Sequence, residues 1–376
     1  MNIVWLSWKD RWHPQAGGAE AVSGKLMDKL VQDGHGVTLI TAMYSGAKSE
    51  DSVNGVRIIR SGGRYTVYLK ARKLLKNEIK SRAPDFVIDE MNTIPFASAF
   101  YSRSTNILLT YQLAREVWHY QMVFPLSLIG YVVEPLYLRL ISKRYSRVLT
   151  ESESTKADLQ RFGFIGTDIK VFRVSIDTPP LAELPAKHEL RTVLSLGAIR
   201  PMKRTLQAVK AFEAARDLNP NLSMVLAGDD TSNYAAKVKR YAMNSRHKDA
   251  VTFLGRVSAD ERLRLMATCA VILVTSIKEG WGLIVTEANS QGTPAIVYDV
   301  DGLRDSVRDG VTGVVVPNDS HKKMGQAING LLSDSISYET LRTNAWEWSK
   351  DFTFENSYGD FLESLPQTIT SKSKIK

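Results

Sequence analysis

The chain has 376 residues, 44% of them hydrophobic and 24% charged, a composition that supports packed cores and argues against disorder. Its length predicts two domains. The single cysteine, Cys269, excludes a disulfide framework and fits a reducing compartment. Most of the net charge of +9 lies in residues 1–175, which hold 24 Lys and Arg against 16 Asp and Glu. Such an excess indicates either an anionic partner or a basic soluble surface.

The sequence predicts neither a signal peptide nor a membrane span. The start MNIVWLSW lacks the basic segment and cleavage site of a signal peptide. The most apolar stretch, residues 122–141, is interrupted by Pro125, Glu134, Pro135 and Arg139, so no run of about 18 uncharged apolar residues occurs. We therefore expect a cytoplasmic protein, and its charge adds the expectation of a peripheral position on the inner face of the membrane.

Short apolar runs alternate with helical periodicity along the whole chain. Helical periodicity is clearest at residues 19–34 and 204–218. Alternation of this kind predicts α/β architecture, with two parallel sheets of about six strands each, covered by helices on both faces. The proline-rich stretch 174–190 marks the join. The predicted strands are residues 2–7, 36–41, 56–60, 85–89, 106–110, 147–150, 192–197, 222–228, 250–255, 270–276, 293–299 and 312–317.

The stretch EGWGLIVTE places two carboxylates, Glu279 and Glu287, directly after the predicted strand 270–276. Ligands of such sheets bind beyond the carboxyl ends of the strands. Gly280 and Gly282 allow a ligand to approach the backbone closely, and a helix beginning at Leu283 and Ile284 would turn its free N–H groups towards an anion. The alternative is that the acids only complement the dipole of the helix. That alternative explains one glutamate but not two glutamates together with two glycines.

The sequence resembles a known enzyme family in several segments. The E-x7-E pattern followed by EANSQGTPAIVYDVDGLRDSV is similar to the signature of retaining glycosyltransferases of family 4, which have the GT-B fold. Five further segments resemble that family in the same order, so the resemblance covers most of the chain. These segments are HPQAGGAEAVSGKLMDKLVQDGHGVTLIT, DEMNTIPF, QLAREVWHYQ, TESESTKADLQRFG and SLGAIRPMKRTLQAVKAF.

The resemblance implies two Rossmann-like domains that face each other across a cleft. Residues 1–175 would bind the acceptor, and residues 176–350 would bind a nucleotide-diphosphate sugar. A C-terminal helix at about 351–366 would pack back on the first domain. The implied reaction transfers a hexosyl unit with retention, by same-face attack that the leaving diphosphate assists. The acceptor would be a glycan, a lipid-linked sugar or a small molecule.

The same resemblance implies roles for the residues after the second-domain strands. Glu279 would hold hydroxyls of the donor sugar, and Glu287 would hold the ribose. Arg200 and Lys203 would clamp the diphosphate, whose charge grows as the sugar leaves. Because these cations take the neutralising role, we expect that no metal and no other cofactor is needed.

Other implied contacts use the backbone. The amides of Gly17 and Gly18 would approach the donor phosphate from the first domain, and the loop with Arg256 and Val257 would hold the base. A compact acidic metal motif is missing from this region. Asp299 and Asp301 have D-x-D spacing, but they follow a different strand.

This chain departs from the family pattern at three positions. Ala198 stands where the family often has its arginine, which here comes two residues later as Arg200, and Arg204 replaces a frequent glycine. Tyr111 stands where the family usually has a histidine beside the reacting centre. Tyrosine can hydrogen-bond a sugar hydroxyl but has no near-neutral pKa. Tyr111 completes the expected catalytic set with Glu279, Lys203 and Arg200. Because it replaces the histidine, we expect an altered sugar contact or reduced activity.

Two basic segments of the first half are candidates for binding an anionic membrane surface. Residues 64–82, whose basic side chains run from Lys70 to Arg82, form one, in which Tyr68, Leu75 and Ile79 recur at helical spacing. The more apolar residues 124–147 form the other. A core helix with a solvated charged face is the alternative for both. No nucleic-acid motif is visible, so we expect no nucleic-acid partner. Two other functions stay open: a GT-B epimerase of sugar nucleotides, and a membrane- or nucleic-acid-binding protein driven by charge.

Overall fold

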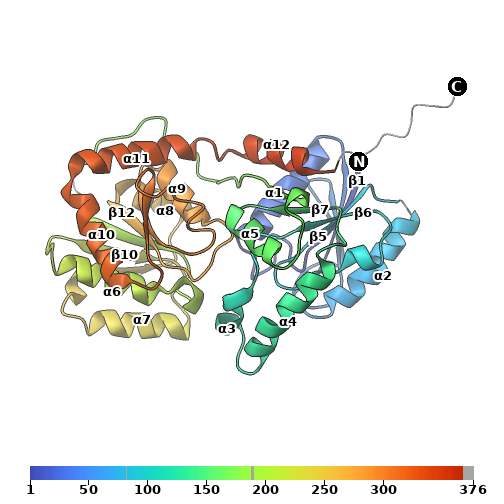
Figure 1. Ribbon diagram of the computed structural model, residues 1–376, viewed down its shortest axis with the longest axis horizontal. Helices are drawn as coiled ribbons and strands as arrows, with labels where there is room; N and C mark the ends of the chain where they lie inside the picture. The colour runs from blue at the N-terminus through green and yellow to red at the C-terminus, as the bar shows by residue number, and fades with distance from the viewer. Residues whose placement is uncertain (82, 188–189, 367–376) are drawn as a thin grey trace. The chain divides into compact units, whose positions relative to one another are not determined.

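The computed structural model describes residues 1–81, 83–187 and 190–366, so Arg82 of the basic segment and residues 188–189 of the predicted join lie outside it. The chain forms two compact units (Figure 1). The N-terminal unit comprises Met1–Arg115, Ile129–Arg173 and the chain from Glu355 on, and the C-terminal unit comprises Glu116–Leu128 and Val174–Phe354. Grouping of residues 116–128 with the C-terminal unit was not expected from the sequence.

The N-terminal unit is built on an eight-stranded sheet with the order β3-β4-β2-β1-β5-β6-β7-β8. All neighbouring strands are parallel except the β3–β4 pair. Strands β3 and β8 were not predicted from the sequence, because the first is polar and the second is short. The strands are β1 (Asn2–Leu6), β2 (Gly36–Thr41), β3 (Glu50–Val53), β4 (Val56–Arg60), β5 (Phe86–Glu90), β6 (Thr105–Leu109), β7 (Arg147–Thr150) and β8 (Ile169–Val171).

Helices cover both faces of this sheet. Val4 and Leu6 of β1 pack in one cluster with Val67 and Leu75 of α2, whereas Trp5 turns the other way, as strand alternation requires. The helices in this half of the chain are α1 (Gly18–Gln32), α2 (Val67–Ser81), η1 (Ser98–Phe100), η2 (Arg115–Val117), α3 (Trp118–Gln121), α4 (Leu126–Ile141), α5 (Glu153–Arg161) and η3 (Gly166–Asp168), of which α3 belongs to the C-terminal unit.

The last helix, α12 (Phe354–Ser364), joins the N-terminal unit through several contacts. Phe361 stacks on Trp5 with ring centroids 6.1 Å apart. Asp360 accepts two hydrogen bonds from the guanidinium of Arg173, at 2.6 and 2.9 Å. The chain therefore returns to its first unit at its C-terminal end.

The C-terminal unit holds six parallel strands in the order β11-β10-β9-β12-β13-β14. Each strand coincides with one of the six apolar runs predicted for residues 192–317. The order reverses between β9 and β12, which defines a topological switch point. The strands are β9 (Thr192–Leu196), β10 (Ser223–Ala227), β11 (Val251–Gly255), β12 (Val271–Val274), β13 (Ala295–Tyr298) and β14 (Gly313–Val316).

Two helical layers enclose this second sheet (Figure 1). Helix α6 packs with α7 and α10, and α9 packs with α8 and α11. Among the helices of the described ranges, none is long and apolar enough to cross a bilayer. The helices are η4 (Pro201–Lys203), α6 (Thr205–Arg216), α7 (Asn233–Met243), η5 (Lys248–Ala250), α8 (Ala259–Thr268), α9 (Leu283–Ser290), α10 (His321–Ser333) and α11 (Ser335–Ser349).

Candidate functional site

A charged pair lies at the switch point of the C-terminal sheet. Lys203 ends η4, which follows β9, and Glu279 lies in the loop between β12 and α9. The Nζ atom of Lys203 is 2.5 Å from Oε1 of Glu279, which also accepts a hydrogen bond from the Ser276 hydroxyl at 2.5 Å. The Lys203 side chain is 36% exposed and that of Glu279 15% exposed, so a ligand can reach both. The structure brings together these two predicted residues from opposite sides of the switch point.

Arg204 fastens the end of η4 to the loop after β12. Its backbone is left-handed, with φ of +47°, a conformation that glycine adopts more readily than arginine. The guanidinium donates to the carbonyl oxygens of Thr275 at 2.8 Å and Ser276 at 2.7 Å and lies over the Tyr298 ring. In return, the Thr275 hydroxyl donates to the Lys203 carbonyl oxygen at 2.9 Å. These bonds fix the backbone on both sides of the charged pair, a role of Arg204 that was not predicted from the sequence.

The loop before α9 depends on glycine and on an aromatic anchor. Gly282 precedes the helix with φ of +99°, and a Cβ atom there would press against Leu303 at 2.8 Å. Trp281 donates from its indole to the Thr286 hydroxyl at 2.9 Å and packs against Phe352 with centroids 5.3 Å apart. Helix α9 therefore begins at Leu283, with Ile284 partly buried against the core, and the Val285 N–H donates to the carbonyl oxygen of Gly282 at 2.8 Å. Binding of an anion at the start of this helix stays a prediction.

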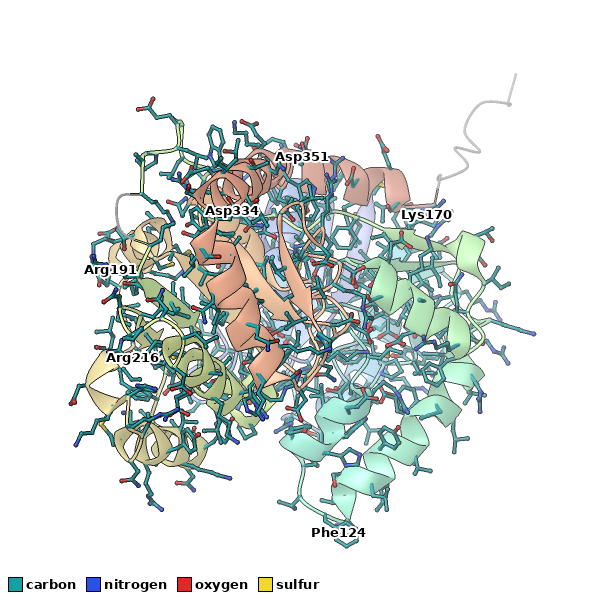
Figure 2. The ribbon with its side chains drawn as sticks, turned by 60° about the vertical axis from the view of Figure 1, so that its left-hand side comes forward. Phe124, Lys170, Arg191, Arg216, Asp334 and Asp351 are labelled. Atoms are coloured by element: carbon teal, nitrogen blue, oxygen red, sulfur yellow. The ribbon has the colours of Figure 1, made fainter. Side chains whose placement is uncertain are left out.

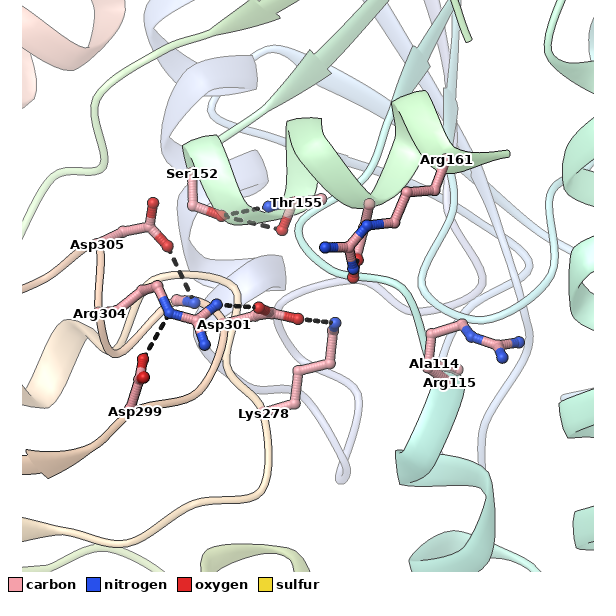
Figure 3. A network of polar contacts seen from close by, with 12 residues as sticks. Ala114, Arg115, Ser152, Thr155, Arg161, Lys278, Asp299, Asp301, Arg304 and Asp305 are labelled. Carbon is pink, nitrogen blue, oxygen red and sulfur yellow. Dashed lines mark hydrogen bonds and ion pairs between the residues drawn. The ribbon is translucent and has the colours of Figure 1, made fainter. Parts of the chain in front are cut away.

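A second ionic network holds the neighbouring loop after β13 (Figure 3). Buried Lys278 pairs with Asp301 at 2.5 Å, and Arg304 pairs with Asp301 at 2.5 Å and with Asp299 at 2.7 Å. The Glu279 N–H donates to the Asp301 carbonyl oxygen at 3.1 Å. Both acids of the D-x-D spacing are thus paired with cations. Within the part of the chain that the structure describes, no three His, Cys, Asp or Glu side chains are placed to hold a metal ion.

Glu287 has a partner that the sequence did not reveal. Its Oε1 atom lies 2.6 Å from Arg262 of α8, and its side chain is 13% exposed. Burial raises the pKa of this carboxyl. A ligand hydroxyl that bound here would share the carboxylate with the Arg262 guanidinium.

The remaining candidates of the C-terminal unit lie along the same edge of the sheet. Arg200 is exposed at the start of η4. Arg256, directly after β11, is 80% exposed and pairs with Asp229 at 2.8 Å, and this bond holds the pKa of the Asp229 carboxyl well below its usual range. Val257 packs against the core, and Gly280 is partly exposed. The Arg200 carbonyl oxygen accepts the Lys203 N–H at 3.0 Å, and among the described contacts the side chains of Arg200, Arg256 and Val257 make no bond to the charged pair.

In the N-terminal unit, Gly17 and Gly18 open α1. The Gly17 N–H donates to Glu20 Oε2 at 2.7 Å, and Glu20 pairs with Lys9 at 2.9 Å. This arrangement is a helix cap, in which the Glu20 carboxylate accepts a backbone N–H at the start of α1. Contacts of the two glycine amides with a phosphate stay a prediction.

Tyr111 lies inside a buried hydrogen-bond chain. Its hydroxyl is 2.5 Å from the Ser23 hydroxyl, which donates to Glu90 Oε2 at 2.8 Å, and Glu90 also accepts from the Trp5 indole at 2.7 Å. Tyr111 is only 6% exposed, and burial raises the pKa of its phenol far above the usual value. The Tyr111 hydroxyl is thus hydrogen-bonded within the protein interior, and its contact with a sugar stays a prediction.

Two carboxyls beside this chain were missed by the sequence analysis. Glu90 ends β5 and Glu151 directly follows β7, and both are almost completely buried. Burial, with repulsion from Glu20, raises the pKa of Glu90 to about 7, and burial, with repulsion from Glu90, raises the pKa of Glu151 to about 8. An acid at the end of a strand gives no sequence signal that distinguishes a buried position from an exposed one.

Comparison with known proteins gives two family matches. The model of "Glycosyltransferase Family 4" matches residues 16–178, and that of "Glycosyl transferases group 1" matches residues 181–348. A D-inositol 3-phosphate glycosyltransferase of Stackebrandtia nassauensis is 28% identical over 184 residues, which cover 47% of this chain and 42% of the relative. Its counterpart in Mycobacterium marinum is 27% identical over 221 residues, with 57% and 47% covered. The matches span about half the length of these curated relatives.

Solved structures resemble the chain over nearly its full length. Sucrose-phosphate synthase from Thermosynechococcus elongatus aligns with a TM-score of 0.77 at 19% identity and covers 96% of this chain and 97% of its own. The Anabaena protein Alr3699/HepE, solved in complex with UDP and glucose, aligns with a TM-score of 0.71 at 16% identity over 97% and 99%. The two family matches and these neighbours show that the chain belongs to the group 1, family 4 glycosyltransferases, a family of transferase enzymes, and has the GT-B fold.

Proposed function

We propose that the chain transfers a hexosyl unit from a nucleotide-diphosphate sugar to a glycan, lipid-linked or small-molecule acceptor, with retention at the anomeric carbon. The observation that carries this proposal is the Lys203–Glu279 pair, which lies at the switch point beside the start of α9. Membership of the family supports a sugar-nucleotide donor. Complexes of the similar Anabaena structure with UDP and with UDP-glucose support uridine diphosphate as the first nucleotide to test.

The pair suits a donor because each partner can exchange its bond for one to the ligand. Lys203 would turn from Glu279 to the diphosphate, next to the N–H groups at the start of α9. Glu279 would then accept hydroxyls of the donor sugar, and Glu287 those of the ribose. Each charged group of the free site thus finds a partner in the complex, which limits the cost of opening the ion pair.

Bond changes in the proposed reaction balance without a further reactant. The bond from the anomeric carbon to the diphosphate oxygen breaks, and a bond from the acceptor oxygen to the same face of that carbon forms. The acceptor proton passes to the diphosphate. Negative charge grows on the diphosphate in the transition state, where the Lys203 ammonium and the helix N-terminus stabilise it most.

A donor screen tests this function. The purified protein is incubated with UDP-glucose and other nucleotide sugars, with and without carbohydrate acceptors, and nucleotide release is measured. We expect nucleotide release with at least one donor and a glycosylated product of retained configuration by NMR. An epimerised sugar formed from the donor alone would indicate the epimerase function in place of transfer. A product of inverted anomeric configuration would contradict retention.

Glu287→Ala is expected to weaken donor binding by roughly 1.5–3 kcal/mol, because charge-assisted hydrogen bonds to the ribose are lost. Titration calorimetry with the free nucleotide and steady-state kinetics measure this effect. The matched control is Glu261→Ala on α8, where the carboxylate pairs with exposed Arg264. Unchanged affinity for the nucleotide in Glu287→Ala would remove the ribose role from this residue.

We also propose that transfer needs no metal, since Lys203 and Arg200 can neutralise the diphosphate. Activity should therefore persist after exhaustive treatment with EDTA. The assay compares initial rates before and after chelation and after addition of Mg²⁺ or Mn²⁺. Complete loss that either ion restores would overturn the proposal.

A further inference from the structure

Three loops at the carboxyl edge of the N-terminal sheet bring aromatic and basic side chains together. Strands β4, β2 and β1 are parallel neighbours, so the loops that follow them, residues 61–66, 42–49 and 7–17, lie at one edge. The Met43 N–H donates to the Gly62 carbonyl oxygen at 2.8 Å, and the Ala42 N–H donates to the Trp8 carbonyl oxygen at 3.4 Å. Backbone bonds thus tie the three loops to one another.

The ring of Trp8 lies at the centre of these side chains and packs partly against the core. The His13 ring meets it edge-on with centroids 5.3 Å apart, and the Tyr44 ring lies 5.3 Å from His13. The guanidinium of Arg64 lies over Trp8, 5.6 Å from the ring centroid, and 5.5 Å from the centroid of the Tyr65 ring. We call this set the loop cluster; it consists of Trp8, His13, Tyr44, Arg64 and Tyr65.

Arg64 is the charged member of the loop cluster, and no carboxylate pairs with it among the described contacts. Three neighbouring cations are each compensated by an acid: Lys9 pairs with Glu20 at 2.9 Å, Arg11 with Asp28 at 2.6 Å and Arg60 with Asp10 at 2.6 Å. The loop cluster therefore presents one uncompensated positive charge on exposed Arg64.

Hydrogen-bond donors of the loop cluster are also available to a ligand. The Nδ1 atom of His13 accepts the Gln15 N–H at 3.0 Å, and burial lowers the pKa of this imidazole, so the neutral ring carries its proton on Nε2. That N–H, the Tyr44 hydroxyl and the Arg64 guanidinium have no hydrogen-bond partner in the part of the chain that the structure describes. Stacking on Trp8 uses the face of the guanidinium and leaves its N–H edge free.

This combination of groups suits a sugar that bears a carboxylate. An aromatic ring offers an apolar face to the C–H groups of a sugar, and Tyr65 is 68% exposed beside Arg64. A guanidinium binds a carboxylate through two parallel N–H···O bonds. A carboxylate matches the single charge of Arg64, whereas a phosphate monoester carries about −1.5 to −2 charges at pH 7 and would exceed it.

We propose that the loop cluster binds the acceptor and selects an acidic sugar, in which Arg64 and His13 hold the carboxylate of a uronic acid and the aromatic rings pack on its apolar face. The inference rests on the proposed function, because it takes the occupant to be the acceptor of glycosyl transfer. The loop after β1 ends at Gly17 and Gly18, whose amides are predicted to approach the donor phosphate. An acceptor on the loop cluster would therefore lie at the edge where the donor is expected.

A comparison of acceptors tests this selection. The full chain is incubated with a donor that it accepts and with methyl glycosides of glucuronic and galacturonic acid, or of neutral glucose and galactose. We expect kcat/KM for at least one acid to exceed that for its neutral counterpart by about 10–100-fold, as for hydrogen bonds to a charged group. Equal use of acid and neutral sugars would overturn the proposal. A preference for glucose 6-phosphate or galactose 6-phosphate over both acids would overturn the assignment to a carboxylate.

Substitutions of arginine assign the preference to a residue. Arg64→Ala should bring the ratio of kcat/KM for acid to that for neutral sugar close to one, and Arg64→Lys should keep part of the ratio, because the charge stays but the paired N–H groups are lost. Arg72→Ala is the control for a stacked guanidinium, since exposed Arg72 on α2 lies 5.4 Å from the centroid of the Tyr101 ring. Arg191→Ala is the control for a lost charge, since exposed Arg191 precedes β9 at the outer edge of the C-terminal unit (Figure 2). Both controls should keep the full ratio, and an equal fall in either of them would remove the role of Arg64.

Direct binding, measured without a donor, keeps this inference apart from the proposed function. Saturation-transfer NMR with the same methyl glycosides should show the acid bound to the unaltered chain and at least about tenfold less to Arg64→Ala. Binding of the acid that depends on Arg64, without nucleotide release from any donor, would support the loop cluster as a binding site and refute the transferase proposal. Transfer to neutral sugars, without binding of either acid, would do the reverse.

Discussion

Lys203→Ala is expected to lower the rate of glycosyl transfer by about 10²–10³-fold, the size of effect seen when one donor that stabilises a growing negative charge is removed. The ammonium lies at the switch point, 2.5 Å from Glu279, and in the proposed complex it moves to the diphosphate. The loss should appear mainly in kcat, because the charge on the leaving group is largest in the transition state. Steady-state kinetics with a saturating acceptor measure it.

Lys239→Ala supplies the matched control for this experiment. Lys239 is 41% exposed and pairs with Asp230 at 2.5 Å in the same unit, so its removal also breaks a half-exposed ion pair. Both variants should lose at most about 1 kcal/mol of stability, as is usual for such pairs. Transfer by Lys203→Ala within a few fold of the unaltered enzyme, at unchanged melting temperature, would refute its role in catalysis.

The sequence predicted the C-terminal sheet almost completely, and the reason is burial. Parallel strands covered on both faces are apolar throughout, so β12 and β13 stand out as short runs such as VILV and AIVY. Edge strand β3, with the sequence EDSV, has no such run and was missed. The positions of Lys203 and Glu279 also follow from the pattern, because the carboxyl ends of neighbouring parallel strands share one edge.

Contacts between distant segments could not be predicted. Glu287 pairs with Arg262 because α8 and α9 pack together. Arg204 hydrogen-bonds to backbone carbonyl oxygens of the loop after β12, and such groups give no sequence signal because every residue carries one. Helical periodicity identifies an apolar face of a helix but not what packs against that face. The pattern of Tyr68, Leu75 and Ile79 on α2 is the same for a core and for a membrane surface, and only the structure assigns it to the core.

Raising the pH from about 5 to about 8 is expected to lower the free energy of unfolding through Glu90 and Glu151. Burial raises the pKa of these carboxyls to about 7 and about 8 in the folded chain, above the ordinary value of 4.5. Over this range the unfolded chain releases the protons while the folded chain still holds them, so ionisation favours unfolding. Above about pH 8 both states are ionised and the effect levels off.

Glu151→Gln isolates this effect, because the amide keeps the shape of the acid and cannot ionise. The Oε1 atom of Glu151 has no hydrogen-bond partner in the described part of the chain, so little bonding is lost. The variant should be more stable than the unaltered chain at pH 8.5 by on the order of 2–4 kcal/mol, with a much smaller difference at pH 4.5. Denaturant unfolding at the two pH values measures the gain. Subtracting the free energy of unfolding of the unaltered chain from that of the variant removes the contribution of the histidines, which both chains share.

Glu153→Gln, two residues along the chain, is the matched control for Glu151→Gln. Its side chain is 68% exposed and pairs with Lys156 one turn away, so the stability of Glu153→Gln should follow that of the unaltered chain at both pH values. Glu90 also accepts a hydrogen bond from Ser23, whose hydroxyl contacts that of Tyr111. A neutral residue 151 would no longer repel an ionised Glu90, so the Glu90–Ser23–Tyr111 hydrogen bonds should persist at high pH. Equal stability of Glu151→Gln and the unaltered chain at pH 8.5 would show that these carboxyls reach water and ionise without strain.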